Sequence, residues 1–413
     1  MFMKKIFILG ASALQVPAIR RAKEKGLYVY ALDYDPEAVG IKDADEFLCI
    51  STIDKEAVLE AAKKYEPDYI ITSTSDMPVR TVAWVNEQLG KGCDISYEDA
   101  ICATNKAAMR KRMKSSGVPV PAYYVAASLE EFLEKAENFA DVFISKPADN
   151  AASRGVVLVN KGRIKDLAGD EGVRESLKEI YEYTHEYSRN GEVLLEEFMT
   201  GPEVSVESFT TGGETHIITI TDKMVTEVPF FVETGHTEPS RLTGEQQLDI
   251  RRVALMAIKA LGVKDGPTHT EIKVTPTGAK LVEIAARLGG DYITSRLVPL
   301  STGVDMIDCC IASTLGEEVK WQRTRENGSA IRYIFAEDSD DEVRTIKSIE
   351  GVEDAKKMPG VEEVVMYKAA GDKAERIKNS GDRLGHVIAT GRDADEAAQN
   401  AERALARINI EYI

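Results

Sequence analysis

The stretch THTEIKVTPTGAKLVEIAARLGG, residues 268–290, predicts two antiparallel strands joined by a tight turn. Two strand-like runs flank residues 276–278, and a three-residue hairpin loop favours glycine in its last, left-handed position. That loop places Glu271 directly opposite Glu283. Like charges that face each other across an antiparallel pair destabilise it, so the arrangement indicates a ligand that offsets the repulsion.

The predicted register also divides the hairpin into an inward face and a ligand face. Ile272, Val274 and Val282 share the face that packs inward, because side chains alternate along a strand. The other face carries His269, Glu271, Lys273, Leu281 and Glu283. A shift of the strand pairing by one residue would exchange the two faces. The side chains that pack inward therefore show whether the predicted register is correct.

A divalent metal ion is the ligand that suits this pair of carboxylates. Two unit charges about 5 Å apart repel by a few kcal/mol at an effective dielectric near 20, and a cation between them reverses the sign. Mg²⁺ is usually held by one or two carboxylates together with substrate phosphates. The alternative is a solvated sheet face with two exposed glutamates. Arg287 and the amides of Gly289 and Gly290 would lie just past the metal, placed for a second anionic group.

Length and composition are those of a globular protein with more than one domain. The 413 residues suggest about two to four domains, and 43% hydrophobic with 29% charged residues is ordinary for globular chains. A net charge of −17 argues against a nucleic-acid or anionic-membrane partner, because no basic excess is available to neutralise phosphates. A small phosphate ligand needs only a local pocket of lysine, arginine, metal and backbone amides.

The cysteines and the apolar runs indicate a cytoplasmic protein. Five cysteines without a CxxC pair form a poor disulfide framework and favour a reducing compartment. The start MFMKKIFILGASAL imitates a signal peptide, but a buried first strand explains it better, because a further strand, helix and strand follow in register. No apolar run approaches the ~20 residues that span a bilayer.

Residues 1–98 alternate short β-branched strands with helices, which predicts a doubly wound parallel sheet. The loop GASALQ, residues 10–15, follows the first predicted strand. A dinucleotide-binding fingerprint requires three glycines, and this loop has only Gly10. Two interpretations stay open: a different ligand at the point where the strand order reverses, or a scaffold domain without a ligand.

Further regions follow this first domain. Residues 99–116 predict one helix that Gly117 ends, and a mixed region of strands and charged helices begins at Val118. A long central region contains the opening hairpin, and strands and helices then alternate to the final amphipathic helix. We expect an α/β and α+β multidomain chain with domains at 1–98, 99–330 and 331–413.

The segment FISKPADNAASRG, residues 143–155, has the composition of a phosphate-binding loop. Lys146 ends a predicted strand and would supply a point charge. The small side chains at 148–155 let backbone amides approach phosphate oxygens. The alternative is a surface hairpin with a solvent-facing lysine.

The segment VLLEEFMTGPEVSVESF, residues 193–209, could hold a nucleobase where its first strand ends. The backbone of an edge strand can pair with a base while Phe198 or Met199 lines the pocket of the ring. An acidic residue shortly afterwards, Glu203, could hold ribose hydroxyls. The alternative is a β-hairpin with exposed acids.

In their order and spacing, these motifs resemble the ATP-grasp superfamily of carboxylate–amine ligases. Within it, the likeness is to L-amino-acid ligases and to the ligases of purine and carbamoyl-phosphate synthesis, and it covers essentially the whole chain. The resemblance implies an N-terminal Rossmann-like domain, a central ATP-grasp fold with a mobile lid at about 118–199, and a small C-terminal α+β domain. It also implies ATP and Mg²⁺, or Mn²⁺, as cofactors and a homodimer as the assembly.

The resemblance further implies a role for each matching residue. Lys106 and Lys146 match the lysines on the α- and β-phosphates, and Arg287 matches the catalytic arginine that steadies the acyl-phosphate. The lid loop would be Ser153, Arg154 and Gly155, the adenine hinge Glu196, Glu197, Phe198 and Met199, the ribose-binding acid Glu203, the Mg²⁺ ligands Glu271 and Glu283, and the substrate-binding residues Glu233, His236, Arg287 and Gly290. Many members read E-x-N-x-R, whereas Ala285 stands at the asparagine position here, so ligation of a second metal by this residue is not expected.

The implied activity is an ATP-dependent ligase that joins a small-molecule carboxylate to an amine through an acyl-phosphate, with an amino acid as one substrate. ADP and phosphate would be released. One alternative within the class is a purine-biosynthesis-type or bicarbonate-using enzyme. Alternatives outside it are a nicotinamide-dependent oxidoreductase, which the missing glycines oppose, and an ATP-binding regulatory protein.

Overall fold

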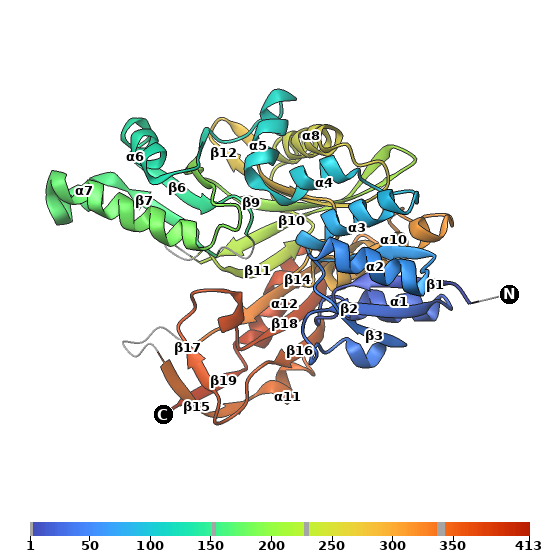
Figure 1. Cartoon of the computed structure of the whole chain (residues 1–413). Coiled ribbons are helices and arrows are strands. Elements are labelled where there is room, and N and C mark those ends of the chain that lie inside the picture. Colours follow the sequence, from blue (N-terminus) through green and yellow to red (C-terminus); the bar gives the residue numbers. More distant parts are fainter. Residues whose placement is uncertain (1–2, 151–153, 227–230, 337–342) are drawn as a thin grey trace.

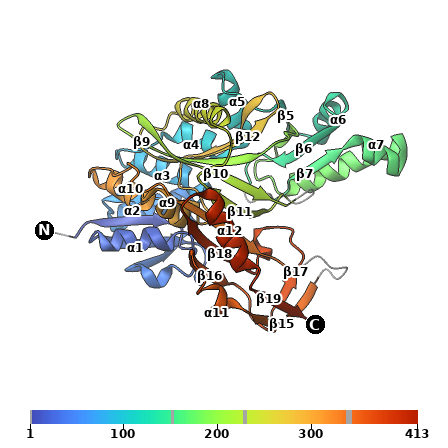
Figure 2. The ribbon, with the colours of Figure 1, turned by 180° about the vertical axis from the view of Figure 1, so that it is seen from behind.

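A computed structural model describes residues 3–150, 154–226, 231–336 and 343–413. The strands of these segments form one parallel sheet, one large antiparallel sheet and two smaller sheets. A green segment with α6 (Leu129–Asn138) and α7 (Lys161–Glu186) projects to one side, and the red C-terminal segment lies below it (Figure 1). The view from behind shows the same separation of these two parts (Figure 2).

The N-terminal sheet forms from short runs that are apolar on both faces. Its order is β3-β2-β1-β4 and every neighbouring pair is parallel. Ile6 and Ile8 pack on one face, and Phe7 and Leu9 on the other. The elements are β1 (Lys5–Leu9), α1 (Val16–Glu24), β2 (Tyr28–Asp33), β3 (Glu46–Cys49), α2 (Lys55–Tyr65), β4 (Tyr69–Ile71) and α3 (Met77–Gln88). The predicted doubly wound parallel sheet is confirmed.

The single helix predicted over residues 99–116 is wrong. Two helices occupy this region, α4 (Tyr97–Thr104) and α5 (Lys106–Ser115). Asn105 between them has extended backbone angles, and its side chain accepts a hydrogen bond from the amide of Ala108. Asparagine is among the preferred residues before a helix because it satisfies a free amide of the first turn. The break places Lys106 at the first position of α5.

The lid sheet, as we name the four strands next to α6 and α7, is separate from the central sheet. Its order is β5-β8-β6-β7, with antiparallel pairs throughout. The strands are β5 (Tyr123–Ala126), β6 (Val142–Pro147), β7 (Val157–Asn160) and β8 (Val193–Glu197). Phe132 of α6 and Tyr181 of α7 pack on Phe143 of β6 in a core of their own.

The central sheet has eight strands in the order β13-β12-β9-β10-β11-β14-β18-β16. The strands are β9 (Glu203–Thr211), β10 (Glu214–Val225), β11 (Glu233–Glu238), β12 (Gly266–Thr275), β13 (Gly278–Ala285), β14 (Gly328–Ile334), β16 (Val361–Met366) and β18 (Gly385–Gly391). The helix α8 (Gly244–Leu261) packs Ile250 and Val253 against β12 and β13. A π-helical segment (Ile293–Leu297), α9 (Val298–Thr302) and α10 (Met306–Leu315) follow the hairpin.

The central sheet continues across the predicted domain boundary at residue 331. β14 pairs with β11 on one side and with β18 on the other, and α12 (Ala394–Leu405) covers this end. The remaining C-terminal elements are β15 (Val343–Glu350), α11 (Val352–Ala355), β17 (Lys373–Glu375) and β19 (Asn409–Tyr412). The domain boundaries themselves stay a prediction.

The β12–β13 hairpin confirms the facing carboxylates but corrects the turn. Glu271 pairs with Glu283, whereas Thr275 pairs with Gly278, so the loop has two residues and not three. A bulge between Glu271 and Ile272 restores the register. In consequence Leu281 and not Val282 packs inward opposite Ile272, and Val282 lines a cavity.

Among the described helices, none is both long and apolar enough on its own to cross a membrane. The bent pair Ile293–Thr302 and Met306–Leu315, at an angle of 105°, meets the length and composition criteria together.

Candidate functional site

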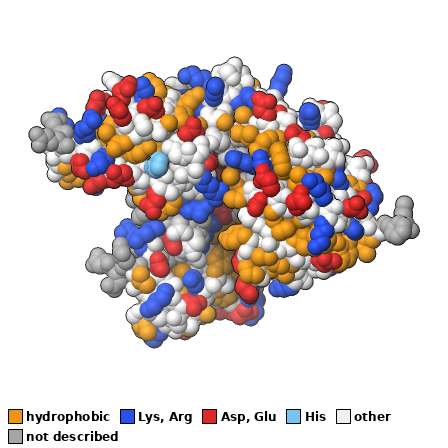
Figure 3. Space-filling view, viewed as in Figure 1, with side chains coloured by type: hydrophobic (Ala, Val, Ile, Leu, Met, Phe, Trp, Pro, Cys, Tyr) orange, Lys and Arg blue, Asp and Glu red, His pale blue; other side chains and the backbone are white. Residues whose placement is uncertain are grey.

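Three cavities meet around the β12–β13 hairpin. The lid cavity, about 190 Å³, lies between the lid sheet and the central sheet. The N-terminal cavity, about 680 Å³, lies at the carboxyl edge of the parallel sheet, and the inner cavity, about 240 Å³, lies beside the loop after β13. The surface is hollowed where the projecting lid meets the rest of the molecule, and Lys and Arg side chains gather there (Figure 3). Of the described residues, only Glu283 lines all three cavities.

The cavities bring most of the predicted site residues together. The lid cavity is lined by Lys106, Lys146, Arg154, Glu196, Glu197, Phe198, Met199, Glu203, Glu271 and Glu283. The inner cavity is lined by Glu233, His236, Glu271, Glu283, Arg287 and Gly290. Gly155 lines none of the three and instead lies against Tyr187, where a Cβ atom would approach the side chain to 2.7 Å. Ser153 lies outside the described residues. The roles of all these residues stay predictions.

Lys106 and Lys146 enter the lid cavity from different elements. The Lys106 Nζ lies 2.9 Å from Glu283 Oε1 and donates to the carbonyl of Asn150 at 2.8 Å. The Lys146 Nζ lies 2.6 Å from Glu196 Oε2. Burial lowers the pKa of Lys146, whereas Glu283 overcomes the effect of burial and raises the pKa of Lys106. Both side chains line the lid cavity, and Lys106 lies beside the hairpin.

Glu196 is not an exposed acid of the predicted hinge but the centre of a buried ion-pair network. Arg110 of α5 is fully buried and donates to both Glu196 carboxylate oxygens, at 2.7 and 3.2 Å. Its guanidinium also donates to the carbonyl of Val282 at 2.6 Å. Burial alone would raise the pKa of Glu196, but Arg110 and Lys146 lower it to about 2. The network therefore ties the lid sheet to the hairpin, and Phe198 and Met199 of the predicted hinge line the lid cavity.

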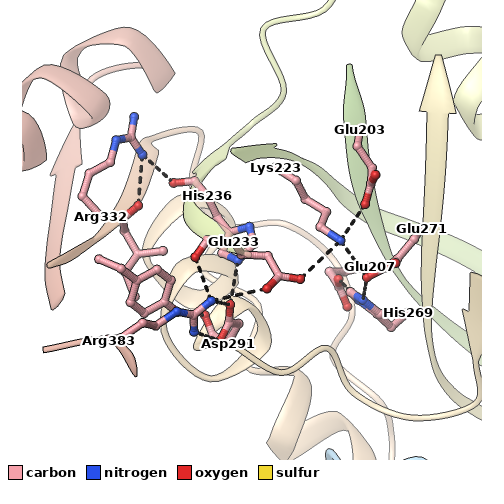
Figure 4. Close-up of polar contacts among 12 residues, drawn as sticks. Glu203, Glu207, Lys223, Glu233, His236, His269, Glu271, Asp291, Arg332 and Arg383 are labelled. Atoms are coloured by element: carbon pink, nitrogen blue, oxygen red, sulfur yellow. Dashed lines mark hydrogen bonds and ion pairs between the residues drawn. The ribbon is translucent and has the colours of Figure 1, made fainter. Parts of the chain in front are cut away.

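The two predicted metal ligands each bind a lysine. The Lys223 Nζ lies 2.8 Å from Glu271 Oε1 and 2.8 Å from Glu203 Oε1 (Figure 4), and Lys106 binds Glu283 in the same way. In the described part of the chain, no group of three or more His, Cys, Asp or Glu side chains is placed to hold a metal. Two facing carboxylates still fit Mg²⁺, because this ion commonly takes one or two protein carboxylates and completes its shell with phosphate and water.

Arg287 is held at the inner cavity by the N-terminal region. Its Nε donates to Asp76 Oδ1 at 2.6 Å, and its Nη1 donates to the carbonyl of Leu288 at 2.8 Å. Gly289 lets the chain pass close to a buried pair, since a Cβ there would lie 2.8 Å from Glu207 and from His269 Nδ1. These contacts fix the guanidinium beside the facing carboxylates, where it can neutralise an anion.

The loop after β1 offers few free amides to a phosphate group. The amide of Ala11 donates to Asp33 Oδ2 at 2.8 Å, and the amide of Ser12 donates to Gln15 Oε1 at 3.0 Å. Gln15 is itself held by the hydroxyls of Thr74 and Ser75. The chain's own side chains therefore occupy these two donors in this structure, which disfavours a phosphate group at this loop.

Sequence reasoning missed several residues of the site. Lys223, Asp76 and Arg110 bind predicted site residues that lie far from them along the chain. For Lys223 one local signal existed, a lysine near the end of the strand run THIITITDK. Nothing local distinguishes Asp76 or Arg110, because their partners are set by the packing of separate elements.

Glu238 is a buried carboxyl group at the end of β11, the strand that carries Glu233 and His236. It accepts hydrogen bonds from the hydroxyls of Thr221 and Ser301, both at 2.8 Å. Burial raises the pKa of Glu238 from 4.5 to about 8. Because the folded state binds this proton more tightly, the resulting stabilisation is complete below pH 4.5 and is lost as the pH rises to about 8.

We expect Glu238→Gln to remove this pH dependence, because glutamine has a similar shape and carries no titrating group. One pKa unit corresponds to about 1.4 kcal/mol, so the wild type should lose a few kcal/mol of unfolding free energy between about pH 5 and pH 9. Urea unfolding across this range measures the difference, with the exposed Glu214→Gln as the control. Parallel stability curves for wild type and Glu238→Gln would contradict the assignment.

Two family models match the chain. Residues 140–295 match the ATP-grasp domain, and residues 344–412 match the L-amino acid ligase C-terminal domain 2. Over the residues that they cover, these matches confirm the predicted resemblance to the ATP-grasp superfamily, and the predicted fold class is confirmed. Within this superfamily its C-terminal segment is of the kind found in L-amino acid ligases.

Solved structures support the same fold over the whole chain. The L-amino acid ligase from Bacillus licheniformis aligns with a TM-score of 0.81 and 19% identity, over 99% of each chain. The phosphoribosylglycinamide synthetase from Anaerococcus prevotii aligns with a TM-score of 0.77 and 20% identity, over 99% of this chain and 100% of the other. At these identities the comparison shows a shared fold.

Curated relatives share part of their length with this chain. The uncharacterized protein y4rH of Sinorhizobium fredii is 31% identical over 305 residues, which are 74% of this chain and 60% of that protein. Carnosine synthase 1 of Gallus gallus is 34% identical over 97 residues, which are 24% of this chain and 10% of that protein. The chain thus spans about three fifths of y4rH and matches a small part of carnosine synthase.

Proposed function

We propose that this protein is an ATP-dependent carboxylate–amine ligase with an amino acid as one substrate. The observation that carries the proposal is the position of Glu283, which lines the lid, N-terminal and inner cavities at once. A ligase of this class must bring a nucleotide, an acid and an amine to one point. Three cavities that share one carboxylate provide that point.

The lid cavity suits the nucleotide. Lys106 and Lys146 would supply positive charge for its phosphates, Phe198 and Met199 would supply an apolar wall for the base, and Glu203 would hold the ribose hydroxyls, since all five line this cavity. Glu271 and Glu283 would hold Mg²⁺, which when bound neutralises phosphate charge during the transfer.

The inner cavity suits the acid. A carboxylate oxygen of the acid attacks the γ-phosphorus of ATP, the bond from phosphorus to the bridging oxygen breaks, and ADP leaves. The product is an acyl-phosphate beside Arg287, whose guanidinium neutralises the anion. An amine then attacks the carbonyl carbon, an amide bond forms, phosphate leaves with the bonding pair, and the nitrogen loses a proton. The protein contributes chiefly by positioning and charge neutralisation, which dominate phosphoryl transfer.

Contacts in the N-terminal cavity favour this proposal over a phosphorylated purine-pathway substrate bound at the loop after β1. Asp33 and Gln15 already occupy the amides that a phosphate group would use there. A formate-dependent phosphoribosylglycinamide formyltransferase from Syntrophotalea carbinolica is 20% identical over 99% of this chain, so this comparison is of fold and not of substrate. We expect the ligase to act in the cytoplasm as a homodimer.

Phosphate release with Mg-ATP tests the proposal. Amino acids and other small acids are supplied alone and in pairs, and the product mass is recorded. We expect at least one pair to release phosphate and ADP where neither member does so alone, with a product whose mass equals both substrates minus water. ATP binding without any substrate-dependent release of ADP would contradict a ligase and favour a regulatory protein.

A further inference from the structure

A fourth cavity, which we name the back cavity, lies between the N-terminal sheet and the start of β12. Its volume is about 690 Å³, similar to that of the N-terminal cavity. Helix α3 and strand β4 form one wall, and α10 and the start of β12 form the other. Both views of the ribbon place α3 beside α10 (Figures 1 and 2). Among the described residues, Arg287 is the one that the back cavity shares with the inner cavity.

One face of α3 runs along the back cavity and sets its length. The side chains of Val79, Val82, Ala83 and Asn86 line the cavity, at the spacing of three and four residues that places side chains on one face of a helix. A rise of 1.5 Å per residue separates Val79 from Asn86 by about 10 Å along the helix. The wall is apolar over most of this length and polar at the Asn86 end, so it suits an elongated ligand with one polar end.

Asn86 carries an unsatisfied acceptor at the polar end of the back cavity. Its side chain is 6% exposed, and its Nδ2 donates to the carbonyl of Ile70 at 3.4 Å. Its Oδ1 accepts no hydrogen bond within the part of the chain that the structure describes. A buried acceptor costs free energy unless a donor meets it. The polar end of the ligand should therefore carry a hydrogen-bond donor.

Carboxylates of the back cavity lie at the same end of α3. Asp94 belongs to the loop after this helix, and Asp265 comes directly before β12. Asp94 is open to solvent on one side, yet the surrounding protein and the nearby carboxylate of Asp265 raise its pKa to about 6, and no described cation opposes them. The ammonium group of Lys91 donates to the carbonyls of Pro67 and Asp68. A donor with a positive charge would offset the repulsion between the two acids, so an ammonium group fits this end.

Two contacts connect the back cavity to the inner cavity. Asp76 stands before the first residue of α3 and accepts a hydrogen bond from Arg287 Nε at 2.6 Å. The Arg287 side chain also lines both cavities itself. A ligand that packs along α3 therefore touches both the guanidinium and the helix that holds it.

We propose that the back cavity is a regulatory site for a primary amine with an apolar chain. The ammonium group meets Asn86 Oδ1 and Asp94, the chain lies along the apolar face of α3, and its free end lies beside Arg287. An occupant there shifts Arg287 and so changes how the ligase binds its acid. The regulatory part rests on the proposed ligase function, whereas binding of the amine does not.

Calorimetric titration without nucleotide or acid tests the binding. The probes share a six-carbon chain and differ at its ends: hexylamine, 1-hexanol, hexanoate and hexane-1,6-diamine. We expect hexylamine to bind at least about tenfold more tightly than each of the others, because only hexylamine combines one ammonium group with an apolar end. Each methylene group removed on the way to butylamine should weaken binding by about fourfold. Equal affinity for hexylamine and 1-hexanol, or no binding of hexylamine, would overturn the inference.

Substitutions at the polar end show whether the amine binds as proposed. Asn86→Leu removes the acceptor at similar size, and Asp94→Asn removes the charge from a side chain that is open to solvent. Each should weaken hexylamine binding by about tenfold, the usual effect of losing one charge-assisted hydrogen bond, and Asp94→Asn should leave 1-hexanol binding unchanged. Asn138→Leu, at the exposed end of α6, is the matched control and should bind hexylamine as the wild type does. Unchanged hexylamine affinity in Asp94→Asn and Asn86→Leu would overturn the site.

Two cysteines report where the amine binds. Cys93 and Cys310 line the back cavity, whereas Cys49 is exposed and lies outside it. At ten times its dissociation constant, hexylamine should slow the alkylation of Cys93 and Cys310 by N-ethylmaleimide about tenfold. Alkylation of Cys49 should stay unchanged, and tandem mass spectrometry measures all three. Unprotected Cys93 and Cys310 would place the amine elsewhere and overturn the site.

Phosphate-release kinetics of an active acid–amine pair test the regulatory part. Saturating hexylamine should change KM for the acid by at least about fivefold in the wild type, with KM for ATP unchanged, and this change should be absent in Asn86→Leu. A reaction with the acid and hexylamine alone controls for hexylamine as a substrate. Binding without a change in KM would overturn the regulatory role. Absence of phosphate release with every acid–amine pair would instead refute the ligase function and leave the amine site standing.

Discussion

Glu283→Gln should lower ligase turnover by at least about a thousandfold, which corresponds to about 4 kcal/mol of transition-state stabilisation. The reason is geometric, because this carboxylate faces Glu271 across the hairpin and lines all three cavities. Glutamine keeps the shape but cannot neutralise a divalent cation. Phosphate-release kinetics measure the loss, and Mn²⁺ titration followed by electron paramagnetic resonance should show weakened metal binding without any turnover.

The control for this variant is Glu214→Gln, which alters an exposed carboxylate of β10 in the same sheet. It should retain wild-type activity and metal binding. Circular dichroism should show the same fold for both variants, since Glu283 is partly exposed and contributes little to the core. If Glu283→Gln kept more than about a tenth of the wild-type rate, Glu283 could not be the shared metal ligand.

Arg110→Met should destabilise the fold by about 3–5 kcal/mol, the usual cost of removing one partner from a buried ion pair. The substitution would leave Glu196 with Lys146 as its remaining cation and would remove the donor to the carbonyl of Val282. Urea unfolding at neutral pH measures this change. KM for ATP should also rise, because the Glu196 carboxylate that orients Lys146 is no longer held in place by Arg110.

Arg112→Met is the matched control on the same helix. Arg112 pairs with Asp99 at 2.6 Å but remains partly open to solvent, and exposed pairs contribute about 0–1 kcal/mol. A loss in Arg110→Met no larger than that in Arg112→Met would show that the buried network does not stabilise the lid against the hairpin.

The β12–β13 hairpin shows both the reach and the limit of sequence reasoning. The pairing of Glu271 with Glu283 is correct, although the predicted three-residue turn is wrong. The observed two-residue turn shifts the pairing by one residue from that of the predicted three-residue turn. The bulge near Val282 shifts it back, so Glu271 still faces Glu283. Alternation of side chains predicts which residues can face each other, but it does not locate a bulge, because the bulge depends on what packs against each face.

The residues that bind the predicted site residues could not be predicted from local sequence. Arg287 binds Asp76 across 211 residues of chain, and Arg383 binds Asp291 across 92. Such contacts follow from how the N-terminal sheet, the central sheet and the C-terminal segment pack together. The parallel sheet of the N-terminal region and the motifs that bring Lys146, Phe198 and Glu203 to one cavity were accessible, because each is a short stretch with its own physical signature.

The central sheet is hydrogen-bonded continuously from β13 to β16. The C-terminal segment, which supplies β14, β18 and β16, therefore cannot be removed as a separate domain. Truncation of the chain before β14 would expose the backbone edge of β11, and unpaired strand edges promote aggregation. Chimeras that exchange a part of this chain should therefore take the lid sheet, whose described strands pair through their backbones with one another, and leave about the last fifth of the polypeptide in place.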